Sequence, residues 1–107
     1  MPQFCITYLG GKQPDNPEAG QKHFARYMEW LNGLGAAAVS PANPMKGTQT
    51  VHPDGSVTDG GNTAMSGFTI IEVDSMDDAL AAAKDCPFLE MEGSLEVSEL
   101  MQMPGMK

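Results

Sequence analysis

The stretch that decides the fold is residues 67–99, which read GFTIIEVDSMDDALAAAKDCPFLEMEGSLEVSE. β-branched and aromatic residues dominate its first seven positions, 67–73, which is typical of a strand. Ser75 then precedes an alanine-rich run and has Asp78 three residues after it, a short relative of the capping box, and Pro87 stops the run. Residues 93–99 resemble a strand again. The segment therefore predicts a strand, a helix packed closely on a sheet, and a final strand.

The N-terminal half predicts a strand followed by a longer helix. Residues 3–9 (QFCITYL) form a strand pattern that ends at a glycine pair. Pro17 suits the first turn of a helix, which runs to Leu34 and stops at Gly35. On a helical wheel one broad apolar stripe contains Phe24, Tyr27, Met28, Leu31 and Leu34.

The middle of the chain predicts a short strand at 36–40 and then a β-hairpin. The turn signal Pro53-Asp54-Gly55 lies between residues 48–52 and 56–59. The full order is two βαβ-like halves with both helices on one face of the sheet. This order predicts one ferredoxin-like α+β domain over residues 1–107, a split βαβ plan with a β-hairpin insertion.

The predicted strands are apolar on both faces, although helices cover only one face. Phe4, Ile6 and Tyr8 alternate with Cys5 and Leu9, and Phe68 and Ile70 alternate with Ile71 and Val73. The second face needs cover, and a second copy packed sheet against sheet supplies it. The residues therefore predict a homodimer. The alternative is that the hairpin and the methionine-rich C-terminal tail cover that face.

Charge and composition exclude several classes of protein. The formal net charge is −8, and the six basic residues are scattered, so nucleic acid and anionic membranes are not expected partners. No apolar run is long enough to span a membrane, and the N-terminus lacks a basic leader region. We therefore expect a cytoplasmic protein, in which Cys5 and Cys86 stay reduced thiols.

The C-terminal half resembles the YCII-related family, also called the DGPF family, of bacterial proteins. The resemblance rests on Asp59-Gly60, on the strand and helix start at 67–80, on Cys86-Pro87 and on the final strand at 93–100. It implies the ferredoxin-like fold in a dimeric α+β barrel. It also implies a cleft between the first helix and the hairpin, and relatives that act on small aromatic or halogenated metabolites with a proposed His–Asp pair.

Two departures from the family pattern affect the expected site. Gly61-Asn62 stands where the DGPF motif has Pro-Phe, so a ligand-facing aromatic residue is missing at that point. Cys86 stands where some members carry an acid. The acidic half of a catalytic pair is therefore less certain in this chain than its histidine.

The candidate catalytic residues are His23 and Asp59. Histidine exchanges protons near neutral pH, and the segment around His23 resembles the one that supplies the histidine in some relatives. Asp59 is the expected orienting acid. Arg26 is expected to hold an anionic substrate, and Tyr8 and Tyr27 to contact the ligand. The alternative readings are a half-exposed helical histidine and an aspartate that only closes an Asx-turn.

Two functional hypotheses follow, from different classes of protein. The first is a small-molecule enzyme that works by proton transfer at His23, in a cleft near the dimer interface. The second is a non-catalytic dimer that binds a small molecule or regulates a partner. Neither needs a cofactor, and the two histidines, His23 and His52, lack metal-ligand spacing.

Overall fold

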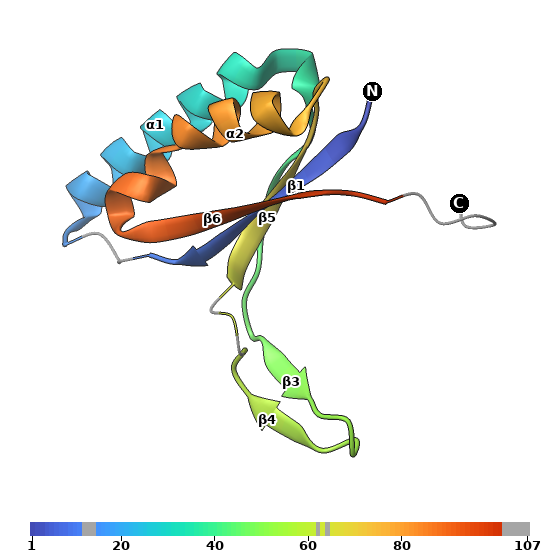
Figure 1. The fold of residues 1–107 in the computed structure, drawn as a ribbon. Coiled ribbons are helices and arrows are strands. Elements are labelled where there is room, and N and C mark those ends of the chain that lie inside the picture. The colour runs from blue at the N-terminus through green and yellow to red at the C-terminus, as the bar shows by residue number, and fades with distance from the viewer. Residues whose placement is uncertain (12–14, 62, 64, 102–107) are drawn as a thin grey trace.

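The computed structural model describes residues 1–11, 15–61, 63 and 65–101. The main sheet has four antiparallel strands in the order β2 (Ala38–Pro44), β5 (Met65–Glu72), β1 (Gln3–Gly10) and β6 (Gly93–Glu99). Helices α1 (Pro17–Leu34) and α2 (Met76–Lys84) both lie on one face of this sheet (Figure 1). The order of elements confirms the predicted ferredoxin-like α+β fold.

The predicted hairpin forms a second, separate sheet. Its strands are β3 (Gln49–Val51) and β4 (Val57–Asp59), and they pair only with each other among the described residues. The hairpin projects away from the main sheet (Figure 1). Asn62 and residues 102–107, most of the tail that was the alternative cover for the sheet, lie outside the described residues.

The helix boundaries follow the predicted signals. The Ser75 hydroxyl accepts a hydrogen bond from the backbone N–H of Asp78 at 3.2 Å, which caps α2. Helix α1 begins at Pro17 and ends where Gly35 takes a positive φ of 56°. The Asn16 side chain caps α1 by accepting a hydrogen bond from the Ala19 N–H at 2.8 Å. This cap was not predicted from the sequence.

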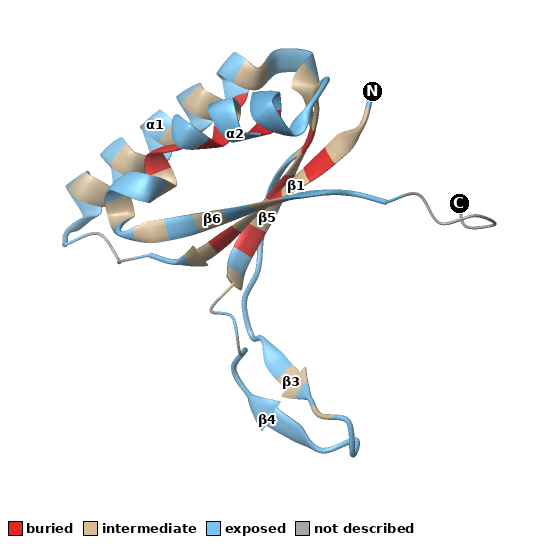
Figure 2. Ribbon diagram, viewed as in Figure 1, coloured by how far each residue is buried: buried red, intermediate tan, exposed pale blue. Residues whose placement is uncertain are grey.

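The core lies between the sheet and the two helices (Figure 2). Its central cluster of buried side chains, among the residues that the structure describes, is Phe4, Ile6, Ile71, Ala79 and Ala83, and Leu31 and Cys86 are buried as well. The two buried alanines confirm that α2 approaches the sheet closely. Two short 3₁₀ helices, η1 (Gly35–Ala37) and η2 (Pro87–Met91), connect the helices to the following strands.

The predicted apolar stripe of α1 is wrong in part. Leu31 is buried, but the side chains of Phe24 and Met28 are 62% and 38% exposed. Trp30, which was left out of the stripe, packs against the core and donates its indole N–H to the Ala82 carbonyl at 3.0 Å. Phe24 and Met28 are exposed because they border a cavity between α1 and the sheet rather than the sheet itself.

The second face of the sheet carries the apolar residues that the strand pattern placed there. Cys5, Leu9, Phe68 and Ile70 are half-buried, whereas the residues that alternate with them on β1 and β5 are mostly buried. Neither described helix covers this face (Figure 1). The homodimer that would cover it stays a prediction. Neither described helix is long and apolar enough to cross a membrane.

Candidate functional site

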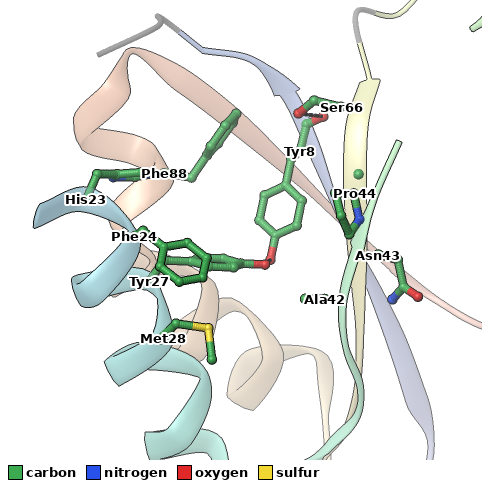
Figure 3. A pocket seen from close by; sticks show the side chains of 11 residues that line it. Tyr8, His23, Phe24, Tyr27, Met28, Ala42, Asn43, Pro44, Ser66 and Phe88 are labelled. Atoms are coloured by element: carbon green, nitrogen blue, oxygen red, sulfur yellow. Dashed lines mark hydrogen bonds between the residues drawn. The ribbon is translucent and has the colours of Figure 1, made fainter. Parts of the chain in front are cut away.

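A cavity of about 370 Å³ lies between the N-terminal half of α1 and the sheet (Figure 3). Five elements contribute to its wall, which is mostly apolar. The lining residues are Tyr8 from β1, His23, Phe24, Tyr27 and Met28 from α1, Ala42, Asn43 and Pro44 from β2, Ser66 and Gly67 from β5, and Phe88 from η2.

Helix periodicity brings the α1 residues together. His23 and Tyr27 are four residues apart, so their side chains lie one turn apart on the same face of the helix. Phe24 and Met28 repeat that spacing one position further on. The helix therefore presents one titratable ring and one phenol to the cavity, beside two apolar side chains.

Strand alternation places Tyr8 on the face of β1 that points toward the helices, where it lines the same cavity. Tyr8 points toward the helices, as Phe4 and Ile6 do, and it is 6% exposed. Its hydroxyl group forms hydrogen bonds with the Tyr27 hydroxyl at 3.0 Å and with the Thr69 hydroxyl. The Thr69 hydroxyl in turn donates to the Pro41 carbonyl at 2.6 Å. Burial raises the pKa of the Tyr8 phenol, so this group stays protonated throughout the physiological pH range.

Phe88 closes one side of the cavity. Its ring packs edge-on to Tyr8, with the ring centroids 5.3 Å apart and the planes at 65°. Two glycines leave room for the ring, because a Cβ atom at Gly11 would lie 2.8 Å from its Cζ atom, and one at Gly93 would overlap it. The role of Phe88 was not predicted from the sequence. The available signal was the pairing of Gly10 with Gly93 in neighbouring strands, which places Gly11 close to Gly93 and marks a close approach.

The structure brings three of the five predicted site residues together. His23, Tyr8 and Tyr27 all line the cavity (Figure 3). Arg26 and Asp59 are not among the described residues that line it. Arg26 forms an ion pair with Glu90 of η2, in which both side chains are more than half exposed. Asp59 is exposed at the end of β4, on the projecting hairpin.

Other reactive side chains lie away from the cavity or are inert. His52 is in the hairpin, where its Nε2 atom is 2.9 Å from the Thr58 hydroxyl. Burial raises the pKa of the Cys86 thiol to about 11, so this cysteine is protonated at neutral pH and packs as a small apolar residue. Within the described residues no three His, Cys, Asp or Glu side chains come close enough to hold a metal ion.

Comparison with known proteins gives a family and shows similarity to solved structures. The model of the YCII-related domain matches residues 4–104. The structure is similar to that of 5-chloro-2-hydroxyhydroquinone dehydrochlorinase from Burkholderia phenoliruptrix AC1100, in complex with 2,5-dihydroxybenzoquinone. The TM-score is 0.59 at 18% sequence identity, over 94% of this chain and 95% of the relative. No curated protein matches the sequence.

Proposed function

This chain belongs to the YCII-related domain family, and we propose that its cavity binds a small aromatic compound with which His23 exchanges a proton. The observation that carries the proposal is the convergence of His23, Tyr8 and Tyr27 on one mostly apolar cavity. Apolar walls with a few converging polar groups are the usual form of a small-molecule site.

The size and walls of the cavity suit a single aromatic ring. Its volume of about 370 Å³ lies in the range of roughly 300–1,000 Å³ that is common for ligand pockets. Tyr8, Tyr27, Phe24 and Phe88 offer ring faces and edges against which a planar ligand packs. The structural relative, whose bound ligand is 2,5-dihydroxybenzoquinone, supports a ligand of this shape.

His23 is the group best suited to move a proton in this cavity. Its ring is half-exposed at the cavity wall and forms no hydrogen bond with another described residue. Imidazole is the side-chain group most often used to give and take protons near neutral pH in general acid–base catalysis. Both phenols are already bonded to other protein groups, so His23 is the lining residue left for this role.

Deuterium exchange into a dihydroxybenzene tests the proposal without a known substrate. The ring carbons next to the hydroxyls of resorcinol exchange hydrogen through a keto form, and a positioned base and acid accelerate that exchange. We expect the wild-type protein to accelerate exchange in D₂O, followed by NMR. His23→Gln should lose about 10²-fold or more of the acceleration while still binding resorcinol.

Two further variants control this experiment. His52→Gln makes the same change on the hairpin and should exchange resorcinol at the wild-type rate. Asp59→Asn tests the predicted orienting acid. If this variant exchanges resorcinol at the wild-type rate, Asp59 has no role in the exchange. If it loses as much rate as His23→Gln, His23 and Asp59 act as a catalytic pair. If His23→Gln exchanges as fast as the wild type, the catalytic role of His23 is refuted.

The second candidate function is binding without catalysis. The observation that favours it is that no carboxylate lines the cavity among the described residues, so His23 has no acid beside it. This candidate predicts that resorcinol binds to the wild type and to His23→Gln with similar affinity, and that neither protein accelerates the exchange. Calorimetric titration beside the exchange measurement separates the two functions.

The homodimer is also part of the proposal. The open face of the sheet presents Cys5, Leu9, Phe68 and Ile70, which are apolar side chains that a second copy would remove from water. Light scattering after size exclusion should give twice the mass of 11.4 kDa. Replacing Phe68 and Ile70 with Asp should give the monomer mass, and a monomeric wild type would refute the dimer.

A further inference from the structure

The hydroxyl groups beside the cavity form one chain with a fixed direction. The single hydroxyl proton of Thr69 is donated to the Pro41 carbonyl, which only accepts. The hydrogen bond between Thr69 and Tyr8 must therefore use the proton of Tyr8. The bond between Tyr8 and Tyr27 must then use the proton of Tyr27, across 3.0 Å. All three protons point away from the cavity, toward Pro41.

Tyr27 is the cavity end of this chain, so its oxygen is left as an acceptor. A phenol oxygen has one proton and two lone pairs, and the proton is already donated to Tyr8. Figure 3 shows the two phenol oxygens meeting at the cavity, with Tyr27 extending from α1 and Tyr8 from the sheet. A ligand that reaches the Tyr27 oxygen makes a hydrogen bond only by donating a proton to it.

The other polar side chains at the cavity are also already donating to the protein. The Asn43 amide nitrogen donates to the Phe68 carbonyl at 3.1 Å and to the Ser40 side chain at 2.9 Å. The Ser66 hydroxyl donates to the Tyr8 carbonyl at 3.4 Å. Among the described lining residues, His23 is thus the one side chain whose N–H groups are not already used within the protein.

We propose that this directed chain makes the cavity selective for aromatic compounds that carry a hydroxyl or N–H donor, with the Tyr27 oxygen as the acceptor. The inference rests on the proposed function and names its ligand class. An aromatic compound of equal size with only a carbonyl or ether oxygen at that position meets a second acceptor. It must either leave the Tyr27 oxygen without a partner or reverse the whole chain of hydroxyl protons.

The chain of hydrogen-bonded hydroxyl groups also gives Tyr27 and His23 different roles at the cavity. Tyr27 binds the ligand hydroxyl but does not remove its proton, because the chain through Tyr8 and Thr69 ends at the Pro41 carbonyl, which accepts a hydrogen bond but is too weakly basic to take up a proton. Tyr27 is therefore a binding residue. His23, one helical turn away, remains the group that exchanges a proton with the bound ring.

A matched ligand pair tests this selectivity. 4-Ethylphenol presents a hydroxyl donor, and acetophenone, of similar size, presents only a carbonyl acceptor. We expect calorimetric titration of the wild type to favour 4-ethylphenol by about 3- to 10-fold in Kd, the net effect of one hydrogen bond. Tyr27→Phe removes the acceptor and should bring the two dissociation constants to within about twofold of each other.

Thr69→Val is the most direct test, because it should abolish the preference by raising the affinity for acetophenone, whereas Tyr27→Phe abolishes it by lowering the affinity for 4-ethylphenol. Without the Thr69 oxygen, the Tyr8 proton turns to Tyr27, and the Tyr27 proton turns to the cavity as a donor. Acetophenone should then gain a hydrogen bond from Tyr27, while 4-ethylphenol, whose oxygen also accepts, keeps one, so the two dissociation constants should come within about twofold of each other. Valine has nearly the shape of threonine, and a melting curve for each variant shows that the protein is folded.

The outcomes distinguish the inference from the function on which it rests. If both ligands bind the wild type equally, the directed chain does not select ligands, although the cavity still binds aromatic compounds. If Thr69→Val keeps the wild-type preference, the assigned proton direction is wrong. If neither ligand binds the wild type, the proposed function fails, and the inference fails with it.

Discussion

The cavity and the β3–β4 hairpin are held together in opposite ways. Contacts at the cavity join residues far apart in sequence, such as Tyr8 with Thr69 and Tyr8 with Phe88. The hydrogen bonds of the hairpin are local, for example from Thr50 to Gly60 and from Ser56 to Asp54. Contacts between distant segments of the chain hold the main sheet and its helices together, whereas the hairpin is held by its turn and by bonds between nearby residues.

This difference shows which region of the molecule holds its side chains in fixed positions. Tyr8 is 6% exposed and its orientation is set by neighbours on three elements, so a ligand meets a preformed surface. Val51 and Val57 of the hairpin are 71% and 55% exposed, and Asp59 is exposed as well. His23, the proposed proton-transfer residue, therefore lies in the region where side chains are held in place, rather than on the hairpin.

The largest predicted effect compares one apolar truncation in each region. Ile6→Ala removes a fully buried side chain from the core under the cavity and should lower the free energy of unfolding by about 2–5 kcal/mol. Val57→Ala in the hairpin should lower it by less than about 1 kcal/mol, because that side chain is more than half exposed. Urea denaturation of both variants measures the difference. Equal losses would mean that the hairpin is part of the core.

A smaller effect compares one added methyl group in each region. Gly93→Ala places its methyl group against the Phe88 ring and should cost about 1–3 kcal/mol through overpacking. Gly61→Ala meets only the Thr48 methyl carbon, at 3.2 Å, and should cost less than about 0.5 kcal/mol. Denaturation gives the free energies, and the aromatic NMR signals of Phe88 and Tyr8 should move in Gly93→Ala alone. Unchanged signals would show that Phe88 is not held by Gly93.

The smallest effect is a pH dependence that arises in the core. The Cys86 thiol ionises near pH 9 in an unfolded chain, and burial raises its pKa to about 11 in the folded protein. Its raised pKa means that stability is complete below pH 9 and falls as the pH rises toward 11, by at most about 1.4 kcal/mol per pH unit. Cys86→Ala should reduce the slope of the curve between pH 9 and 10, below the ordinary pKa of tyrosine, and the slope that remains is expected from Cys5, because burial raises the pKa of that thiol too. An unchanged slope in that variant would show that Cys86 is not the responsible group.

The fold was predictable because its signals are local and mutually consistent. Strand alternation, the Ser75 cap, Gly35 and the turn at Pro53-Asp54-Gly55 each specify an element within a few residues of themselves. The strand predicted at 36–40 was wrong at both ends, since residues 36–37 belong to η1 and β2 runs from Ala38 to Pro44, through Pro41. An edge strand tolerates this proline because its outer N–H groups need no partner.

The site was predictable only in the part that helix and strand periodicity determine. His23 and Tyr27 share a helix face, so finding them together follows from their spacing, and Tyr8 follows from its strand face. The position of Phe88 depends on two glycines brought together by strand pairing. The hydroxyl chain through Thr69 to Pro41 crosses three strands. No local pattern in the sequence encodes such contacts, and for the same reason the distance of the hairpin from the cavity was not foreseen.

The most direct test of the central claim is an NMR titration of the ¹⁵N-labelled protein with resorcinol. If the cavity is the ligand site, the largest changes in backbone shifts should cluster at Tyr8, His23, Tyr27 and Phe88, while residues 49–59 of the hairpin stay unchanged. Changes centred on the hairpin or on the open face of the sheet would contradict the account, because they would place the ligand outside the cavity.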